Sequence, residues 1–381
     1  MKRKIVVTTG TRAEYGLLRL LLNEIKSSKK LELNLIVAGM HLSKKHGNTI
    51  KEIRNDGFQI YDKVKMIPTG NSPYDMSKTL GLGILKFSKI FHKLKPEINV
   101  ILGDRDESFA SAIAAFHMNI PNAHIHGGDK SQAGIDEYIR HAITKISNIH
   151  FTASKKSTER VKKMGENPKY VFYTGSPGID EVVQKKFSSK KELELKYNIK
   201  FSGQEILLLQ HPITTQSERS RKEIQETLNA IKQIKKTTIA ILPNSDSGHK
   251  EIFSAMKIFS RKYEFFKVFP SIPRNDYLGF LNNCGVLVGN SSSGVVEGSY
   301  FNIPIINIGS RQKGRERGNN VIDVDYSEKK IHDMICQALS SKKSKFVNNY
   351  VYGKGNASKK IVKHLETIIL NKKLIEKQII Y

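Results

Sequence analysis

Short runs of aliphatic and other β-forming residues alternate with segments of helical periodicity along the whole chain. This alternation predicts βαβ units and parallel sheets. In the first half we expect strands at residues 4–8, 33–38, 100–102, 123–125, 149–152 and 170–174, and helices at 17–25, 86–94 and 107–118. Together these elements predict one doubly wound domain.

The series restarts after Gly175-Ser176-Pro177-Gly178, where glycine and proline favour a hinge. Further strands are expected at 206–209, 238–242, 264–268, 286–288 and 305–308. The sequence therefore predicts an α/β protein with two Rossmann-like domains, 1–175 and 176–357, that face each other across a cleft. An amphipathic helix over 358–379 is expected to pack back on the first domain. Since open α/β sheets bind ligands at the carboxyl ends of their strands, the site is expected in that cleft.

The charge balance leaves several partners open. The 381 residues include 63 Lys and Arg against 36 Asp and Glu, a formal charge of +27, which suits nucleic acid, anionic membranes or phosphorylated small molecules. The lysines are scattered in pairs with acids between them, and Trp is absent. This pattern favours a solvated basic surface over a nucleic-acid partner.

The cellular setting is predicted from what the sequence lacks. No apolar run approaches the length of a membrane span, so no membrane partner is expected. The two cysteines, Cys284 and Cys336, form no disulfide framework and fit a reducing compartment. We therefore expect a soluble, cytoplasmic protein.

The first expected strand ends in a glycine turn, residues 9–16, that carries Arg12 and leads into a helix. Backbone N–H groups at a helix start and a guanidinium both suit a phosphate. The alternative is a tight turn with a solvated arginine.

Acids and histidines follow the next strands of the first half. Asp104 and Arg105 come directly after the strand at 100–102, where a carboxylate serves as a helix N-cap, a general base or both. The strand at 123–125 leads into a group of polar residues that continues onto a helix: His124, His126, Asp129, Asp136, Arg140 and His141. We favour a metal-free acid/base cluster, with a metal site and a structural cluster as alternatives.

The second half carries a second set of candidates. His211 ends the strand at 206–209, and the loop Gly289–Gly294 presents Ser291 and Ser292 ahead of a helix with Glu297 about two turns in. Such a loop suits a diphosphate, and the carboxylate suits the paired hydroxyls of a ribose. The alternative is an ordinary serine N-cap. Arg311 follows the strand at 305–308.

Seven motifs in order resemble the hydrolysing UDP-N-acetylglucosamine 2-epimerases of sialic-acid-type sugar biosynthesis. They are GTRAEYG, LGDRDES, HIHGGD, GIDEYIRHAITK, LQHPITT, GNSSSGVVE and INIGSRQKGRERGNNV. The resemblance implies the two-domain GT-B fold, a homodimer or homotetramer, and no metal or organic cofactor. It also implies a reaction: UDP leaves the sugar of UDP-N-acetylglucosamine, or of a 2,4-diacetamido-6-deoxy relative, and water adds to the resulting glycal to give the 2-epimer.

The resemblance assigns roles by position. Asp104 and Asp136 match the catalytic carboxylates, and the third group is either His126, our preferred candidate, or Asp129. Diphosphate, sugar and nucleotide contacts fall to the remaining candidates: Arg12, Arg105, His211, Ser291, Ser292, Glu297 and Arg311. A non-hydrolysing 2-epimerase and a GT-B glycosyltransferase are the alternatives, and a non-catalytic nucleic-acid-binding protein is a third.

Overall fold

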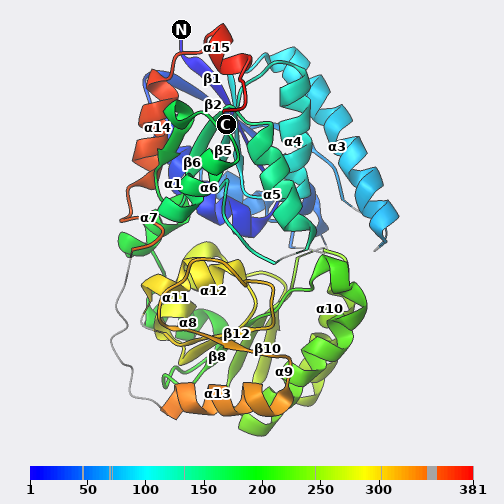
Figure 1. Cartoon of the computed structure of the whole chain (residues 1–381). Coiled ribbons are helices and arrows are strands. Elements are labelled where there is room, and N and C mark those ends of the chain that lie inside the picture. The colour runs from blue at the N-terminus through cyan, green and yellow to red at the C-terminus, as the bar shows by residue number, and fades with distance from the viewer. Residues whose placement is uncertain are drawn as a thin grey trace. The chain divides into compact units, whose positions relative to one another are not determined.

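The computed structural model describes residues 1–44, 47–67, 70, 72–132, 134–244, 246–301, 303–340 and 350–380. The chain forms two compact units (Figure 1). The first contains residues 1–129, 136–184 and 351–381, and the second contains residues 130–135 and 185–350.

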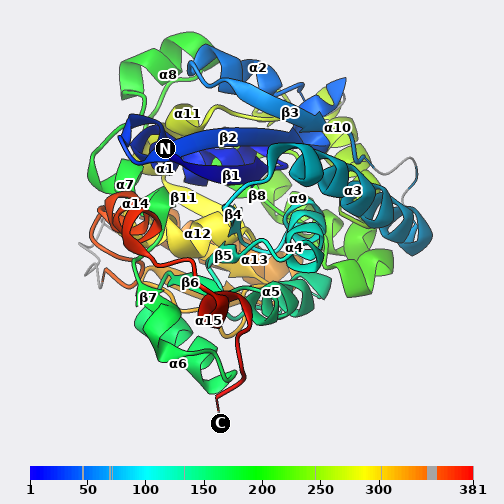
Figure 2. The same ribbon diagram turned by 90° about the horizontal axis from the view of Figure 1, so that it is seen from above.

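The first unit is built on a parallel sheet of seven strands in the order β3-β2-β1-β4-β5-β6-β7. Figure 2 shows β1 and β2 side by side, in register from Arg3 with Leu31 to Thr9 with Val37. The strands are β1 (Arg3–Thr9), β2 (Leu31–Ala38), β3 (Ile60–Val64), β4 (Ile98–Leu102), β5 (Asn122–Ile125), β6 (Ile149–Thr152) and β7 (Val171–Tyr173). The chain order reverses between β1 and β4, which is where doubly wound sheets bind ligands.

Helices cover both faces of this sheet because successive strand residues point to opposite sides. Ile5 and Val7 pack with α1 and α14, whereas Val6 packs with α3 and α4. The helices are α1 (Arg12–Ser27), α2 (Ile50–Asn55), α3 (Pro73–Leu94), α4 (Asp106–His117), α5 (Ile135–Lys145), α6 (Lys155–Lys163), α7 (Pro177–Val183), α14 (Ala357–Thr367) and α15 (Lys372–Ile375), with 3-10 turns η1 (Gly39–Leu42) and η3 (Pro168–Tyr170).

The second unit is built on a parallel sheet of six strands in the order β10-β9-β8-β11-β12-β13. Its strands are β8 (Ile206–Leu209), β9 (Thr238–Ile241), β10 (Phe266–Phe269), β11 (Val286–Gly289), β12 (Ile305–Ile308) and β13 (Val321–Val324). Its helices are α8 (Lys190–Tyr197), α9 (Ser220–Ile234), α10 (His249–Lys262), α11 (Arg274–Asn283), α12 (Ser292–Val296) and α13 (Glu328–Ser340), with 3-10 turns η4 (Thr214–Arg219) and η5 (Gly298–Tyr300). Two parallel-sheet α/β domains were predicted from the sequence, and the structure has them.

The units divide at a different place from the hinge expected at residue 175. Helix α7 belongs to the first unit, which continues to Gln184, because α7 packs against α1 and α14. Ser176 also donates its backbone N–H to the carbonyl of Tyr352, 2.8 Å away. Gly175, with a positive φ of 86°, turns the chain inside the unit, and Pro177 and Gly178 begin α7.

The single helix expected over 358–379 is wrong. It is two helices, α14 and α15, because Ile368 has extended dihedrals (φ −64°, ψ 133°) and the Asn371 side chain caps α15. Ile361 and Leu365 of α14 are fully buried in the core of the first unit.

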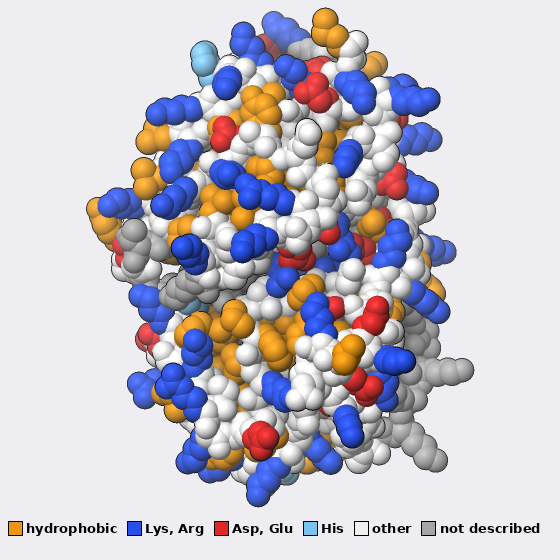
Figure 3. All heavy atoms as spheres, turned by 180° about the vertical axis from the view of Figure 1, so that it is seen from behind, with side chains coloured by type: hydrophobic (Ala, Val, Ile, Leu, Met, Phe, Trp, Pro, Cys, Tyr) orange, Lys and Arg blue, Asp and Glu red, His pale blue; other side chains and the backbone are white. Residues whose placement is uncertain are grey.

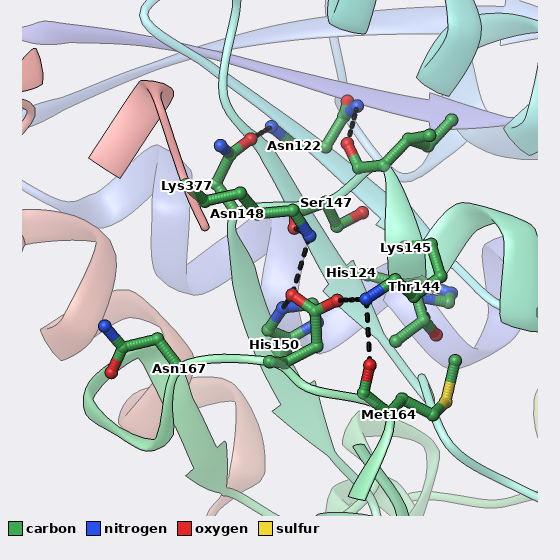
Figure 4. Close-up of polar contacts among 12 residues, drawn as sticks. Asn122, His124, Thr144, Lys145, Ser147, Asn148, His150, Met164, Asn167 and Lys377 are labelled. Carbon is green, nitrogen blue, oxygen red and sulfur yellow. Dashed lines mark hydrogen bonds and ion pairs between the residues drawn. The ribbon is translucent and has the colours of Figure 1, made fainter. Parts of the chain in front are cut away.

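The end of the tail is tied to the sheet by a buried carboxylate, Glu166. Figure 4 shows the side chains of its three partners, Lys145, His150 and Lys377. Glu166 Oε2 accepts from Lys377 Nζ at 2.6 Å and from His150 Nε2 at 3.1 Å, and Oε1 accepts from Lys145 Nζ at 2.8 Å. Burial opposes ionisation of Glu166, but these three donors outweigh it and lower its pKa to about 2. A segment from the far end of the chain thus closes the first unit beside β6.

The surface carries the positive charge in a dispersed form. On the face shown in Figure 3, Lys and Arg side chains are spread among uncharged, apolar and occasional acidic side chains. Within the described ranges, no helix combines the length and apolarity required to cross a membrane.

Candidate active site

The glycine turn after β1 is held by the helix that follows it. Thr11 is the N-cap of α1 and accepts the Glu14 backbone N–H, and Glu14 Oε2 accepts the Gly10 backbone N–H at 2.6 Å. Arg12 lies at the first position of the helix, where its Nε is 2.6 Å from Glu52 Oε2. The turn thus presents an arginine at a helix start, an arrangement that suits an anion.

Asp104 is fixed by a buried arginine. Arg140, on α5, is 2% exposed and binds both Asp104 Oδ2 and Glu137 Oε2, and its Nη1 also donates to the Asp129 carbonyl at 3.0 Å. Burial alone would lower the pKa of Arg140, but the acidic neighbours Asp104, Asp129 and Glu137 outweigh it and raise the pKa, so the guanidinium stays charged. This one side chain therefore connects the ends of β4 and β5 with α5 and orients the Asp104 carboxylate.

His126 and Asp129 form a buried hydrogen-bonded chain with two serines. His126 Nδ1 is 3.0 Å from Asp129 Oδ2, and His126 Nε2 is 2.9 Å from the Ser176 hydroxyl oxygen. The Ser157 hydroxyl donates to Asp129 Oδ1 at 2.7 Å. His126 has a positive φ of 67°, a strained conformation for a non-glycine residue that is typical of functional sites. The choice between His126 and Asp129 as third group stays a prediction, since each holds the other.

His124 lies beneath the Asp104 loop as a neutral support. Its Nε2 donates to the Gly103 carbonyl at 2.8 Å, and its Nδ1 is 3.2 Å from Thr144 Oγ1. Complete burial lowers the pKa of His124 to about 3, so its imidazole is uncharged at neutral pH.

The other candidates of the first unit lie nearby on the same segments. Asp136 is half-buried in the first turn of α5, one helical turn before Arg140. Arg105 is the N-cap residue of α4, with its Nε 3.8 Å from Glu107 Oε2. His141 Nε2 is 3.1 Å from Glu137 Oε1. No group of three or more His, Cys, Asp or Glu within the described ranges is arranged to hold a metal ion.

In the second unit, Asn290 brings three loops together. Its Oδ1 accepts the His211 backbone N–H at 2.7 Å, and its Nδ2 donates to the His211 carbonyl at 2.9 Å. Its own carbonyl accepts from Arg311 Nη1 at 3.2 Å and from Gln312 Nε2 at 2.9 Å. The predicted residues His211 and Arg311 are therefore positioned by a residue that the sequence reasoning left out.

The serine loop begins α12 as expected, with Ser291 as its N-cap and Ser292 exposed at its first helical position. The loop passes close to β8, because a Cβ on Gly289 would lie 1.8 Å from the Leu209 carbonyl oxygen. Glycine is therefore required where this loop starts.

Glu297 lies at the end of its helix. It is the C-cap residue of α12, about one and a half turns from the start, because α12 is only five residues long and gives way to the 3-10 turn η5. The Glu297 carboxylate is buried and binds Arg274 Nη1 from the start of α11. Arg274 was missed by the sequence analysis because it precedes Glu297 by 23 residues with no motif to link them.

Comparison with known proteins supplies the family. The model of the family described as UDP-N-acetylglucosamine 2-epimerase matches residues 23–366. The chain is 36% identical over 377 residues to a UDP-N,N'-diacetylbacillosamine 2-epimerase (hydrolyzing) from Legionella pneumophila, covering 99% of each chain. It is 35% identical over 346 residues to a GDP/UDP-N,N'-diacetylbacillosamine 2-epimerase (hydrolyzing) from Campylobacter jejuni, covering 90% of this chain and 89% of that protein.

Among solved structures, the fold matches a UDP-GlcNAc 2-epimerase from Neisseria meningitidis bound to UDP-GlcNAc. The TM-score is 0.78 at 16% identity, with 95% of this chain and 99% of that chain covered. The predicted fold class, two Rossmann-like domains of the GT-B type, is confirmed by this match and by the two parallel sheets.

Proposed function

Because the chain belongs to the UDP-N-acetylglucosamine 2-epimerase family, we propose that it is a hydrolysing 2-epimerase that releases UDP and a free 2-epimeric amino sugar. The observation that carries the reaction type is full-length identity of 36% to a relative named as hydrolysing. That relative and the Campylobacter protein both favour a UDP-2,4-diacetamido-6-deoxy sugar as substrate, with UDP-N-acetylglucosamine as the second candidate.

The nucleotide is assigned to the second unit. Ser291 and Ser292 offer hydroxyls and N–H groups at the start of α12, where the helix dipole favours a diphosphate. Glu297 takes the ribose hydroxyls, and His211 and Arg311 contact the phosphates and the nucleotide. Asn290 aligns these loops without any net charge of its own, so it adds no repulsion toward UDP.

The acid/base work is assigned to the first unit. The hydrogen on carbon 2 lacks an adjacent carbonyl, so its removal requires that UDP leave carbon 1 readily. Arg12 and Arg105 stabilise the negative charge that grows on UDP. A carboxylate removes the carbon 2 proton, and the C1–O bond breaks to give UDP and a 2-acetamidoglucal.

The second half of the reaction adds water across the double bond. The water oxygen bonds to carbon 1 and loses a proton, while a second acid delivers a proton to carbon 2 from the opposite face. Asp104 and Asp136 are the proposed pair, and His126 or Asp129 completes the proton transfers. Arg140 orients the Asp104 carboxylate for its role.

The test is incubation with both UDP-sugars in deuterated water, with products identified by NMR. We expect UDP and a free 2-epimer that carries deuterium at carbon 2, and no product from the matched Asp104→Asn variant. Detection of a UDP-linked 2-epimer would show that the enzyme is a non-hydrolysing 2-epimerase. Sugar transfer to an added acceptor would favour a glycosyltransferase, and retention of the original hydrogen would overturn the elimination.

A further inference from the structure

A buried carboxyl outside the proposed acid/base groups lies directly behind the Arg12 turn. Glu14 is 4% exposed, with Oε2 2.6 Å from the Gly10 backbone nitrogen and Oε1 2.8 Å from Ser108 Oγ. Ser108 belongs to α4, two residues after its start, and its Oγ is also 3.0 Å from the Leu102 carbonyl oxygen. Glu14 therefore bridges the β1 turn and the β4 loop that carries Asp104 and Arg105.

The two hydrogen bonds of Ser108 Oγ, to Glu14 and to Leu102, need two hydrogens, and an ionised Glu14 has none to give. The Ser108 hydroxyl has a single hydrogen but faces two acceptors, Glu14 Oε1 and the Leu102 carbonyl. If Glu14 Oε1 carries a proton, it donates to Ser108 Oγ, and the Ser108 hydroxyl then donates to Leu102. In this form, the three contacts of Glu14 with Gly10, of Glu14 with Ser108 and of Ser108 with Leu102 each have a hydrogen.

The surroundings favour the same protonation state. A second carboxyl, Glu107, faces Glu14 from α4, and it lies so close to the turn that a Cβ on Gly10 would be 2.5 Å from its Cδ. Arg105 is the facing cation. Burial is the main effect that raises the pKa of Glu14 to about 7, with repulsion from Glu107 adding to it and the bonds from Gly10 and Ser108 opposing it.

We propose that Glu14 is a neutral carboxylic acid that couples the Arg12 turn to the Asp104–Arg105 loop, and that its ionisation weakens this coupling; its effect on catalysis rests on the proposed function. Ionised Glu14 would compete with the Leu102 carbonyl for the Ser108 hydrogen, repel Glu107 and draw Arg105 inward. Glu14 thus positions Arg12 and Arg105, and its protonation state controls that positioning.

The first experiment measures the proton without reference to activity. Glu14→Gln keeps the geometry of the neutral acid, because its amide N–H donates to Ser108 and its amide oxygen accepts from Gly10. Urea unfolding of the wild type and E14Q is followed from pH 5 to pH 8, with Glu159→Gln, an exposed glutamate on α6, as the matched control.

The sign of the expected difference follows from the raised pKa. The unfolded chain loses the Glu14 proton near its ordinary value of 4.5, whereas the folded protein keeps it to about 7. Relative to E14Q, the wild type therefore loses stability as pH rises between these values, and the ratio of unfolding constants changes by about tenfold per pH unit. An infrared difference spectrum of wild type minus E14Q should also show the carbonyl band of a protonated acid at pH 6.

A pH-independent ratio, or the absence of that band at pH 6, would overturn the proposal. The second experiment compares kcat/KM of the wild type and E14Q at each pH, which cancels the ionisation of the substrate itself. The wild-type value should fall relative to E14Q above about pH 7, and E159Q should follow the wild type. If both proteins lack 2-epimerase activity while the unfolding ratio still shifts, the proposed function fails and the protonated acid stands.

Discussion

The candidate residues of each unit lie at the carboxyl ends of its strands, which we call the first edge and the second edge. The two edges hold their functional side chains by opposite means. At the edge of the first unit, Asp104 is held by the charge of Arg140, inside a cluster that also contains Glu137. At the edge of the second unit, the loops of His211 and Arg311 meet on the neutral amide and carbonyl of Asn290. Buried charges shift proton affinities strongly, whereas a neutral amide fixes geometry without altering them. The first edge is suited to proton transfer and the second to binding an anionic nucleotide.

The largest effect is expected from removing the buried charge of the first edge. Arg140→Met leaves the Asp104 and Glu137 carboxylates without their cation. We expect the free energy of unfolding to fall by about 3 kcal/mol, the low end for breaking a buried ion pair, because the two carboxylates are 22% and 20% exposed. The kcat of the remaining folded protein should fall by about a thousandfold.

The matched control for that change is Arg19→Met, which breaks the pair of Arg19 with buried Glu181, 2.7 Å apart, in the same unit. This variant should lose comparable stability in urea but retain the kcat of its folded fraction. Equal losses of kcat in the two variants would show that Arg140 acts on stability alone.

A smaller effect should separate the two candidates for the third catalytic group. His126→Ala should lower kcat by about a hundredfold with folding intact, and Asp129→Asn should lower it by clearly less. Steady-state assays with circular dichroism on both variants test the order. The reverse order would assign the role to Asp129, with His126 as the group that orients it through the 3.0 Å bond.

At the second edge, the pair of Glu297 with Arg274 beside the serine loop should affect binding and not the proton-transfer steps. Glu297→Gln should weaken UDP affinity by roughly ten- to a hundredfold, as expected for a lost charge-assisted hydrogen bond. Calorimetry measures this directly. Glu205→Gln, a buried glutamate of the same unit that caps the Ser202 backbone, is the control and should bind UDP like the wild type.

The smallest effect is expected from the neutral amide. Asn290→Ala should weaken UDP binding by about fivefold to tenfold, because the His211 loop loses two hydrogen bonds to the Asn290 side chain, worth about 1 kcal/mol each. The bond from Arg311 to the backbone carbonyl of residue 290 is retained. Asn320→Ala, which removes a buried amide that supports Gly298 and Ile303, should leave UDP affinity unchanged. A shift in the pH profile of N290A would contradict the contrast between the two edges.

The elements that the sequence predicted well are the central strands. Residues 206–209 form β8 within the expected bounds, because four consecutive aliphatics are typical of a buried parallel strand. The edge strands β3 and β13 were missed, since IYDKV and VIDV bury few of their residues and carry charges. Hydrophobic periodicity reports burial, so exposed and charged strands such as β3 and β13 give a weak signal. The other two edge strands, β7 and β10, were expected, at 170–174 and 264–268.

The site was predictable in position but not in its contacts. Strand-end motifs pointed to Asp104, His126 and Ser291, because parallel strands bring their carboxyl ends to one edge. The partners that hold them lie far along the chain: Arg140 is 36 residues from Asp104, and Ser176 is 50 residues from His126. Such pairs depend on how helices pack, which a local pattern does not encode.

The Glu166 cluster sets an order of events during synthesis. Lys377, one of the cations that neutralise this buried carboxylate, is translated 211 residues after it. At about 5–20 residues per second, the ribosome needs roughly 10–40 s to make that stretch. Residues 185–350, which are all of the second unit except residues 130–135, emerge during this interval. The domain that begins first is therefore the last to be completed, and a nascent chain must keep Glu166 and His150 hydrated until the tail arrives.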